Sequence, residues 1–364
     1  MTKASIQTSY FFAAAITATS AWTGAGSAQV SLSYATYFPA NDPLVQVDRW
    51  FMEQVEERTS GAIKFEQYLG GAMLGGPEIY PGLSRGAVDL GMSVPAAFQA
   101  NEYILSNVTL PYVTNDSTAV TYAFNQLLQE TPALVQEYEN QNIKLLYGLG
   151  FSENNIWSNT PIRTLEDMSG MRIRSVMSIA DALNILGAVP VSMAFGDAVS
   201  AVQRGVIDGM SSAPFLTTVG FGAHEFVPFV SDGGGMGVYA VSSTGINLDV
   251  WSGLSSEHQA VIEEIVSEIP DFYTDLMNVL VGEAVDAVKE AGITEVIIMS
   301  DEEKARVRDA VVDPLRANWF ERAQAADLDG EAFFERYNEL VQESASSRNY
   351  VPGLELYVQR YGTE

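Results

Sequence analysis

The stretch Thr164–Gly209 decides the fold of this chain; it reads TLEDMSGMRIRSVMSIADALNILGAVPVSMAFGDAVSAVQRGVIDG. Thr164 with Asp167 three positions later has the spacing of a capping box, which predicts a short helix. The pattern then predicts a strand through Arg174, an amphipathic helix, a short second strand and a second helix that ends at Gly205–Gly209. A strand that ends in an arginine, followed by this alternation, is typical of an α/β lobe bordering a cleft. The stretch therefore predicts a binding protein.

The residues before this stretch show the same alternation of strand and helix. Val30–Ala35 alternate apolar and polar positions, the apolar positions from Val45 to Val55 follow a helical period, and Ile63–Tyr68 alternate again. Glu78–Arg85 then predicts a helix and Val88–Val94 a third strand. This order predicts a first α/β lobe whose sheet has parallel pairings.

The residues after this stretch predict a return to the first lobe. Asp232–Gly235 lacks the spacing of a phosphate-binding loop, so we interpret it as a turn before a strand over Met236–Ser242. A long helix is predicted from Ser255 to Gly292, with a kink at Pro270.

The length of the chain predicts two lobes, because 364 residues exceed the ~250–300 at which a single core stops growing. We expect lobe one to comprise 29–150 plus about 240–275, and lobe two 151–239 plus about 276–340. A C-terminal extension, 341–364, is expected either to cover a lobe or to reach a second subunit, so the chain is predicted to be a monomer or a homodimer.

The order of these elements resembles a known family. With Ala87-Val88-Asp89 upstream and Ile246–Leu254 downstream, the chain is similar to the extracytoplasmic solute-binding subunits of TRAP transporters, the DctP family. The resemblance extends from about Val30 to about Leu340 and depends on the order of the motifs. It implies an α/β, two-lobed periplasmic binding protein fold, with a hinge cleft and long helices bridging the lobes. It also implies a receptor that binds an organic acid and delivers it to membrane subunits.

Composition excludes several classes of function. The formal net charge is −27 with 19 Lys and Arg, which would repel nucleic acid at long range. Cysteine is absent, so disulfides, thiolate catalysis and Cys-ligated metals are excluded. His224 and His258 lack the spacing of a metal site or a catalytic triad. We therefore predict no metal, no cofactor and no catalytic residue.

The first 28 residues have the layout of a secretory signal peptide. Lys3 precedes an apolar run from Tyr10 to Ile16, and small residues from Gly24 to Ala28 follow. The apolar run is shorter than the ~20 residues that a membrane-spanning helix needs. We expect cleavage near Ala28 and a periplasmic protein.

Arg174 is the strongest candidate for a ligand-binding residue. It ends a predicted strand, and ligands of open α/β sheets bind outside the carboxyl ends of strands. Its guanidinium matches a carboxylate through two parallel hydrogen bonds. The resemblance also implies this role, because the last arginine of the Gly-x-x-x-Arg motif clamps the substrate carboxylate in that family. The alternative is a structural arginine paired with Asp197 or Asp208, and Arg172 is expected to pair with a surface acid.

The resemblance implies further ligand-binding residues. Phe195 matches an aromatic that flanks the ligand, Ser212 stands where many relatives carry an asparagine, and Phe215 lies nearby. Tyr37 ends a strand of lobe one, and Asn154 stands where relatives that bind sialic acid carry a second arginine. Ordinary core packing is the alternative for the aromatics, and loop hydrogen bonding is the alternative for Asn154 and Ser212.

Two departures from the sialic-acid pattern narrow the ligand class. Asn154 replaces a cation and Val94 replaces an acid, which favours a smaller or more apolar monocarboxylate. Two other functions stay open: a secreted enzyme acting on a small carboxylate, and a sensory ligand-binding ectodomain. The acid clusters Glu263-Glu264 and Asp301–Glu303 do not favour the enzyme, because a solvated helix face and a helix N-terminus account for them.

Overall fold

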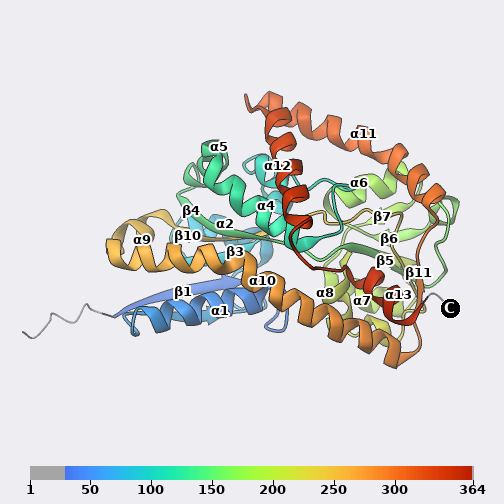
Figure 1. Ribbon diagram of the computed structural model, residues 1–364, viewed down its shortest axis with the longest axis horizontal. Coiled ribbons are helices and arrows are strands. Elements are labelled where there is room, and N and C mark those ends of the chain that lie inside the picture. The colour runs from blue at the N-terminus through green and yellow to red at the C-terminus, as the bar shows by residue number, and fades with distance from the viewer. Residues whose placement is uncertain (1–28, 363–364) are drawn as a thin grey trace, which may run out of the picture.

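The computed structural model describes residues 29–362 and contains two β-sheets with helices packed around them (Figure 1). The predicted signal peptide lies outside the described residues. The two sheets lie side by side in the view and one long helix extends across both, so the predicted two-lobed α/β fold is confirmed. No helix of residues 29–362 combines the length and the apolar character needed to cross a membrane.

The first sheet has five strands and contains the N-terminal β-α-β unit that the alternation predicted. Its strand order is β2 (Ile63–Tyr68), β1 (Val30–Thr36), β3 (Leu90–Ser93), β10 (Val241–Asn247), β4 (Ile143–Gly150). β1 runs parallel to β2 and β3, whereas β10 is antiparallel to β3 and β4. Its helices are α1 (Pro43–Arg58), α2 (Gly76–Ser84), α3 (Pro95–Phe98), α4 (Ser117–Glu130), α5 (Pro132–Glu139) and α9 (Leu248–Gly253).

The second sheet has six strands and contains the stretch Thr164–Gly209. Its order is β11 (Glu295–Ile297), β9 (Phe229–Ser231), β5 (Asn154–Ser158), β8 (Gly209–Pro214), β6 (Arg172–Arg174), β7 (Val189–Val191). β6 runs parallel to both of its neighbours, β7 and β8. The helices α6 (Met177–Ile185), α7 (Phe195–Gln203) and α8 (Phe215–Gly220) belong to this sheet. The carboxyl end of β6 therefore lies beside the short connections from β7 to α7 and from β8 to α8.

The prediction of a strand over Met236–Ser242 is wrong at its first half, because β10 begins only at Val241. Gly237 adopts a left-handed φ of 71°, and a Cβ there would lie 2.3 Å from the carbonyl oxygen of Thr114. This close approach bends the chain away from a strand. Residues 236–240 instead form one of two segments that cross between the sheets. They are bonded to the other crossing segment, which joins β4 to β5: Phe151 N donates to Ala240 O, and Asn154 N donates to Gly237 O.

Four helices follow α9, and the first of them, α10 (Ser256–Ala291), packs on both halves of the molecule. It packs on α1 and α4 of the first sheet and on α8 and α13 of the second. Ser255 caps it by accepting from His258 N, and left-handed Gly292 ends it. α11 (Asp301–Ala325) packs on α6, α12 (Gly330–Ala345) on α4, and α13 (Gly353–Tyr361) on α8 and β11. Within this one chain, the C-terminal helix α13 packs against α8, α10 and β11 (Figure 1).

Asp48 is a fully buried acid of α1 that ties this helix to three strands of the first sheet. Its carboxylate accepts from the Tyr34 hydroxyl of β1, the Tyr147 hydroxyl of β4 at 2.7 Å and the Thr244 hydroxyl of β10 at 3.0 Å. Burial raises the pKa of Asp48 to about 6. The three donors keep the carboxylate hydrogen-bonded although water cannot reach it.

Glu137 of α5 is a second buried acid, and it makes stability depend on pH. Its carboxylate accepts from Leu105 N at 2.6 Å and from Ser106 N and Oγ at 3.2 Å, while burial raises its pKa from 4.5 to about 7. The folded chain therefore holds this proton more tightly than the unfolded chain does. The stability that this proton contributes is full below pH 4.5 and is lost as the pH rises through about 7.

We expect Glu137→Gln to remove this loss. We measure the free energy of unfolding of variant and wild type by urea unfolding at pH 5 and at pH 8. The variant minus wild-type difference should be larger at pH 8 than at pH 5. Glu139→Gln, an exposed position on the same helix, is the control and should follow wild type. An identical pH dependence for Glu137→Gln and wild type would contradict the raised pKa.

Candidate functional site

Arg174 lies at the carboxyl end of β6 with its guanidinium turned into the protein, and only 7% of the residue is exposed. Nε donates to Met193 O at 3.1 Å, and Nη1 donates to Ser212 O at 3.0 Å and to Ser211 O at 3.3 Å. Three backbone carbonyls therefore fix the guanidinium. Within residues 29–362, no carboxylate lies within ion-pair distance of it.

Asp208, one of the acids offered as an alternative partner for Arg174, pairs with Arg172 instead. The two carboxylate oxygens accept from Arg172 Nη2 at 2.8 Å and Nε at 3.0 Å. Both side chains are partly exposed, and the pair lies on the outer surface. This agrees with the prediction that Arg172 pairs with a surface acid, and it leaves Arg174 without Asp208.

The electrostatic environment of Arg174 is that of a buried cation. Burial lowers the pKa of its guanidinium, and the nearby hydroxyls of Tyr239 and Tyr37 act in the opposite direction. The group stays charged at neutral pH, because an arginine pKa is far above 7. A buried charge without a counter-ion is costly. An incoming carboxylate would supply the missing charge.

Aromatic side chains from both sheets surround this cation. The ring centroid of Phe195 lies 5.4 Å from Arg174 Cζ. Phe195 also makes an edge contact with Phe221 at 5.1 Å. On the side of the first sheet, Tyr37 meets Phe98 edge-on at 5.8 Å, and on the crossing segments Tyr239 stacks on Phe151 at 6.1 Å. The cluster of Arg174, Tyr37, Phe195 and Tyr239, here called the Arg174 cluster, combines one cation with apolar ring faces.

Ser212 belongs to this cluster through its backbone, and its hydroxyl is already engaged. The Ser212 hydroxyl donates to Val176 O at 2.9 Å, accepts from Val176 N at 3.0 Å and lies 3.1 Å from Ser175 Oγ. Its backbone has a left-handed φ of 46°, a costly conformation for serine, which presents the carbonyl to Arg174. Ser212 therefore positions the guanidinium, and its hydroxyl has little capacity left for a ligand.

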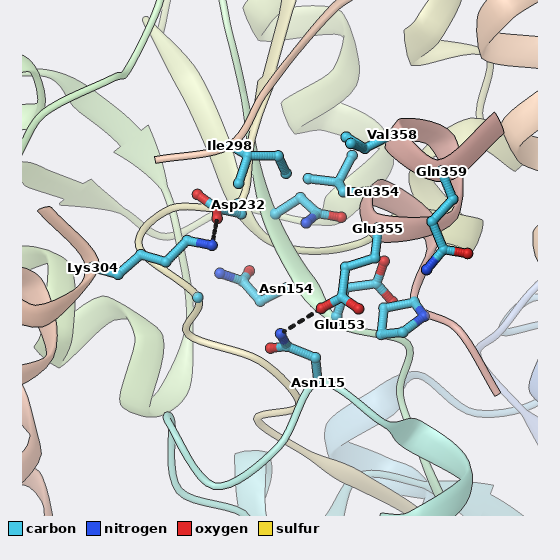
Figure 2. A pocket seen from close by; sticks show the side chains of 13 residues that line it. Asn115, Glu153, Asn154, Asp232, Ile298, Lys304, Leu354, Glu355, Val358 and Gln359 are labelled. Atoms are coloured by element: carbon cyan, nitrogen blue, oxygen red, sulfur yellow. Dashed lines mark hydrogen bonds and ion pairs between the residues drawn. The ribbon is translucent and has the colours of Figure 1, made fainter. Parts of the chain in front are cut away.

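Asn154 and Phe215 make no hydrogen bond or ring contact with Arg174, although Asn154 is bonded to Ser211, whose carbonyl accepts from Arg174. Asn154 Oδ1 accepts from Ser211 Oγ at 3.1 Å and Ala213 N at 3.3 Å, and the residue lines a cavity beneath α13 (Figure 2). Phe215 is fully buried and stacks on Trp157 at 6.1 Å. A Cβ on Gly353 would lie 2.3 Å from Phe215 Cδ1. Strand pairing thus engages the oxygen of Asn154, and core packing engages the ring of Phe215, as the alternatives to a ligand role expected.

A cavity of about 310 Å³ lies between the β1–α1 loop and the helices α8 and α10. Asp42 and Phe221 are among its lining residues, and Phe221 links it to the Arg174 cluster through Phe195. Arg174 itself does not line it. Across this cavity Thr217 Oγ1 lies 3.5 Å from Asp42 Oδ2, a contact between the two sides.

Sequence reasoning missed Tyr239 as a neighbour of Arg174, and Phe151 as the ring that stacks on Tyr239. Tyr239 lies inside the segment that was predicted as a strand, and Phe151 follows β4 directly. A signal was present, since the glycines around Met236 break the strand pattern and mark a crossing segment. Within residues 29–362, no group of three His, Asp or Glu side chains is placed to hold a metal ion.

Comparison with known proteins gives a consistent result. The family model of bacterial extracellular solute-binding proteins, family 7 (DctP), matches residues 34–322. The chain is 29% identical over 287 residues to the C4-dicarboxylate-binding periplasmic protein DctP of Rhodobacter capsulatus, covering 76% of this chain and 83% of that protein.

Solved structures show the same fold. A TRAP periplasmic solute-binding protein from Desulfovibrio salexigens superposes with a TM-score of 0.78 at 26% identity, covering 89% of this chain and 99% of that one. A TRAP solute-binding protein from Rhodoferax ferrireducens, in complex with copurified benzoate, superposes with a TM-score of 0.77 at 19% identity, covering 88% and 99%.

Proposed function

Since the chain belongs to the DctP family of bacterial extracellular solute-binding proteins, which are receptors of TRAP transporters and not enzymes, we propose that its solute is a monocarboxylate with an apolar, preferably aromatic body. Arg174 binds the carboxylate, and Phe195 and Tyr37 contact the rest of the solute. The observation that carries the proposal is the buried guanidinium of Arg174, held by three carbonyls and free of any carboxylate among the described residues.

The surroundings of Arg174 favour one carboxylate and an apolar body. A second cation would favour a second carboxylate, but the position where the resemblance to sialic-acid-binding relatives implies an arginine is Asn154, which is uncharged and whose Nδ2 lies 3.9 Å from Met236 Sδ. The rings of Phe195, Tyr37 and Tyr239 instead offer faces and edges on which an aromatic acid can pack. The benzoate in the Rhodoferax ferrireducens structure supports this class of solute.

Delivery to membrane subunits in the periplasm is part of the same proposal. Closure of the two lobes over the solute would exclude water and strengthen the ion pair with Arg174. The proposed lobes are 29–150 with about 240–275, and 151–239 with about 276–340. The two crossing segments that meet through Phe151 and Ala240 lie between them and would act as the hinge.

A thermal-shift screen tests the solute class. Benzoate, phenylacetate and mandelate are compared with benzamide, which has the ring without the charge, and with succinate, which has a second carboxylate. A solute that binds only the folded chain raises the melting temperature. We expect a shift with at least one aromatic acid and none with benzamide. A shift with succinate alone would contradict the proposal and indicate a dicarboxylate receptor.

Phe195→Ala tests the aromatic contribution. The variant loses the ring 5.4 Å from Arg174 Cζ. We therefore expect the affinity for the aromatic acid identified in the screen to fall by about 3- to 30-fold by isothermal titration calorimetry, the range of a cation–π contact plus apolar burial. Phe320→Ala is a matched control, because Phe320 is also partly buried with an edge contact but belongs to α11. Equal affinities for Phe195→Ala and wild type would remove Phe195 from the site.

A further inference from the structure

The last two helices lie beyond the part of the chain that the family model matches, which ends at residue 322. α12 packs on α4 of the first sheet, whereas α13 packs on α8 and β11 of the second. Residues 346–352 join the two helices and therefore pass from one half of the molecule to the other. Arg348 fixes this segment to the middle of α10, since its Nη1 donates to Pro270 O at 3.1 Å. We call residues 346–361 the C-terminal strap.

The first turn of α13 is bonded to one of the two segments that cross between the sheets. The N-cap of α13 is Pro352, whose side chain cannot accept a hydrogen bond. Gly353 N instead donates to Glu153 Oε1 at 2.7 Å. Glu153 belongs to residues 151–153, which join β4 to β5, and it lies beside the first turn of α13 (Figure 2). The C-terminal strap is therefore attached to the proposed hinge.

Gly353 also lies directly against the ring of Phe215, the first residue of α8. A Cβ on Gly353 would lie 2.3 Å from Phe215 Cδ1, so a larger residue would have to displace this ring, which is fully buried. Phe215 N donates to Glu153 O at 3.3 Å, and Leu216 N donates to Ser152 Oγ at 3.4 Å. The strap, the β4–β5 segment and the first turn of α8 thus pack together.

These contacts reach Arg174 through β8. The strand ends at Pro214, directly before Phe215. The carbonyls of Ser211 and Ser212 on this strand accept from Arg174 Nη1. A displacement of Phe215 would therefore shift carbonyls that lie three and four residues away and that orient the guanidinium.

We propose that the C-terminal strap positions the solute site, by holding the hinge and the two carbonyls that orient Arg174. Gly353 and Glu153 are the positioning residues, and they act through β8 rather than by touching the solute. The effect on the solute rests on the proposed function, whereas the effect on the carbonyls does not. A strap that only stabilised the fold would change the melting temperature and leave the affinity for the solute unchanged.

Amide hydrogen exchange of the solute-free protein tests the effect on β8. In Gly353→Ala the added Cβ displaces the ring of Phe215, so we expect the amides of residues 211–216 to exchange at least about threefold faster. Gly330→Ala is the matched control, because Gly330 begins α12 and a Cβ there would lie 2.7 Å from Ala323 Cβ on α11. These amides should exchange in the control as in wild type. Equal exchange in the two variants would overturn the proposal.

Two substitutions of Glu153 test the same effect without changing α13. Glu153→Ala removes the acceptor for Gly353 N, whereas Glu153→Gln retains one. Burial raises the pKa of Glu153 to about 8, so the neutral amide resembles the side chain as it exists at pH 7. We expect faster exchange over 211–216 in Glu153→Ala and wild-type exchange in Glu153→Gln. Equal exchange in these two variants would also overturn the proposal.

Calorimetric titration with the aromatic acid found in the screen, at a temperature where every variant is folded, tests the effect on the solute. Gly353→Ala and Glu153→Ala should weaken binding by about 2- to 30-fold at unchanged stoichiometry, whereas Gly330→Ala and Glu153→Gln should bind as wild type does. Lower melting temperatures with wild-type affinities would overturn the proposal. If no acid binds wild type, the proposed function fails, and the exchange experiment still decides the role of the strap.

Discussion

Arg174→Ala is expected to weaken binding of the carboxylate solute by about 100- to 1,000-fold. Removing one partner of a buried charge pair costs about 2–5 kcal/mol, because the other charge is left unpaired in a desolvated site. Arg174 is 7% exposed, and its guanidinium is held in place by Met193, Ser211 and Ser212. Arg174→Lys keeps the charge but loses the planar donor fork, so we expect a smaller loss of about 10- to 100-fold.

Isothermal titration calorimetry with the aromatic acid found in the screen measures both losses. Arg172→Ala is the matched control: Arg172 lies two residues earlier on the same strand but pairs with Asp208 at the surface. Its affinity should equal that of wild type. If Arg174→Ala bound the acid as tightly as Arg172→Ala did, the carboxylate would have to bind elsewhere.

Asp48→Ala is expected to lower the free energy of unfolding by roughly 3–6 kcal/mol. The substitution leaves the hydroxyls of Tyr34, Tyr147 and Thr244 without their acceptor in a fully buried site. Each unsatisfied buried polar group costs about 1–3 kcal/mol. The three hydroxyls come from three strands, so the loss affects the whole first sheet.

Urea unfolding at pH 7 measures the loss. Glu53→Ala replaces an exposed acid on the same helix and should change stability by less than about 0.5 kcal/mol. Asp48→Asn retains an acceptor of similar size and should cost less than Asp48→Ala. A value for Asp48→Ala close to that of Glu53→Ala would mean that the three hydroxyls find other partners.

The order of helices and strands could be predicted from sequence because each element carries a local signal. Asp42 caps α1 by accepting from Leu44 N at 2.9 Å, and Ser300 caps α11 by accepting from Glu303 N at 3.3 Å. The apolar period of α1 predicts the face that is buried. Arg174 could be predicted as a ligand-binding residue for the same reason, because the end of a strand is a local feature of the sequence pattern.

The other features depend on contacts between residues distant in sequence. The sequence predicts that Phe215 lies near the ligand because it closely follows Ser212. In the structure, Gly353, which is distant in sequence, packs against the ring of Phe215. The Ser212 hydroxyl is taken by Val176, a partner that spacing does not reveal. Asn154 likewise binds Ser211 across the sheet. Whether these three residues contact the solute therefore stays a prediction.

The 36-residue helix α10 has a further consequence for how the protein denatures. At about 1.5 Å per residue it is roughly 54 Å long. It contributes Tyr273, Met277 and Val281 to the larger of the two hydrophobic clusters, which continues across both sheets. If either lobe unfolds, the part of α10 that packs on it loses its packing partners. Heating should therefore give one calorimetric transition whose van't Hoff and calorimetric enthalpies agree, and a solute bound at one lobe should delay the melting of both.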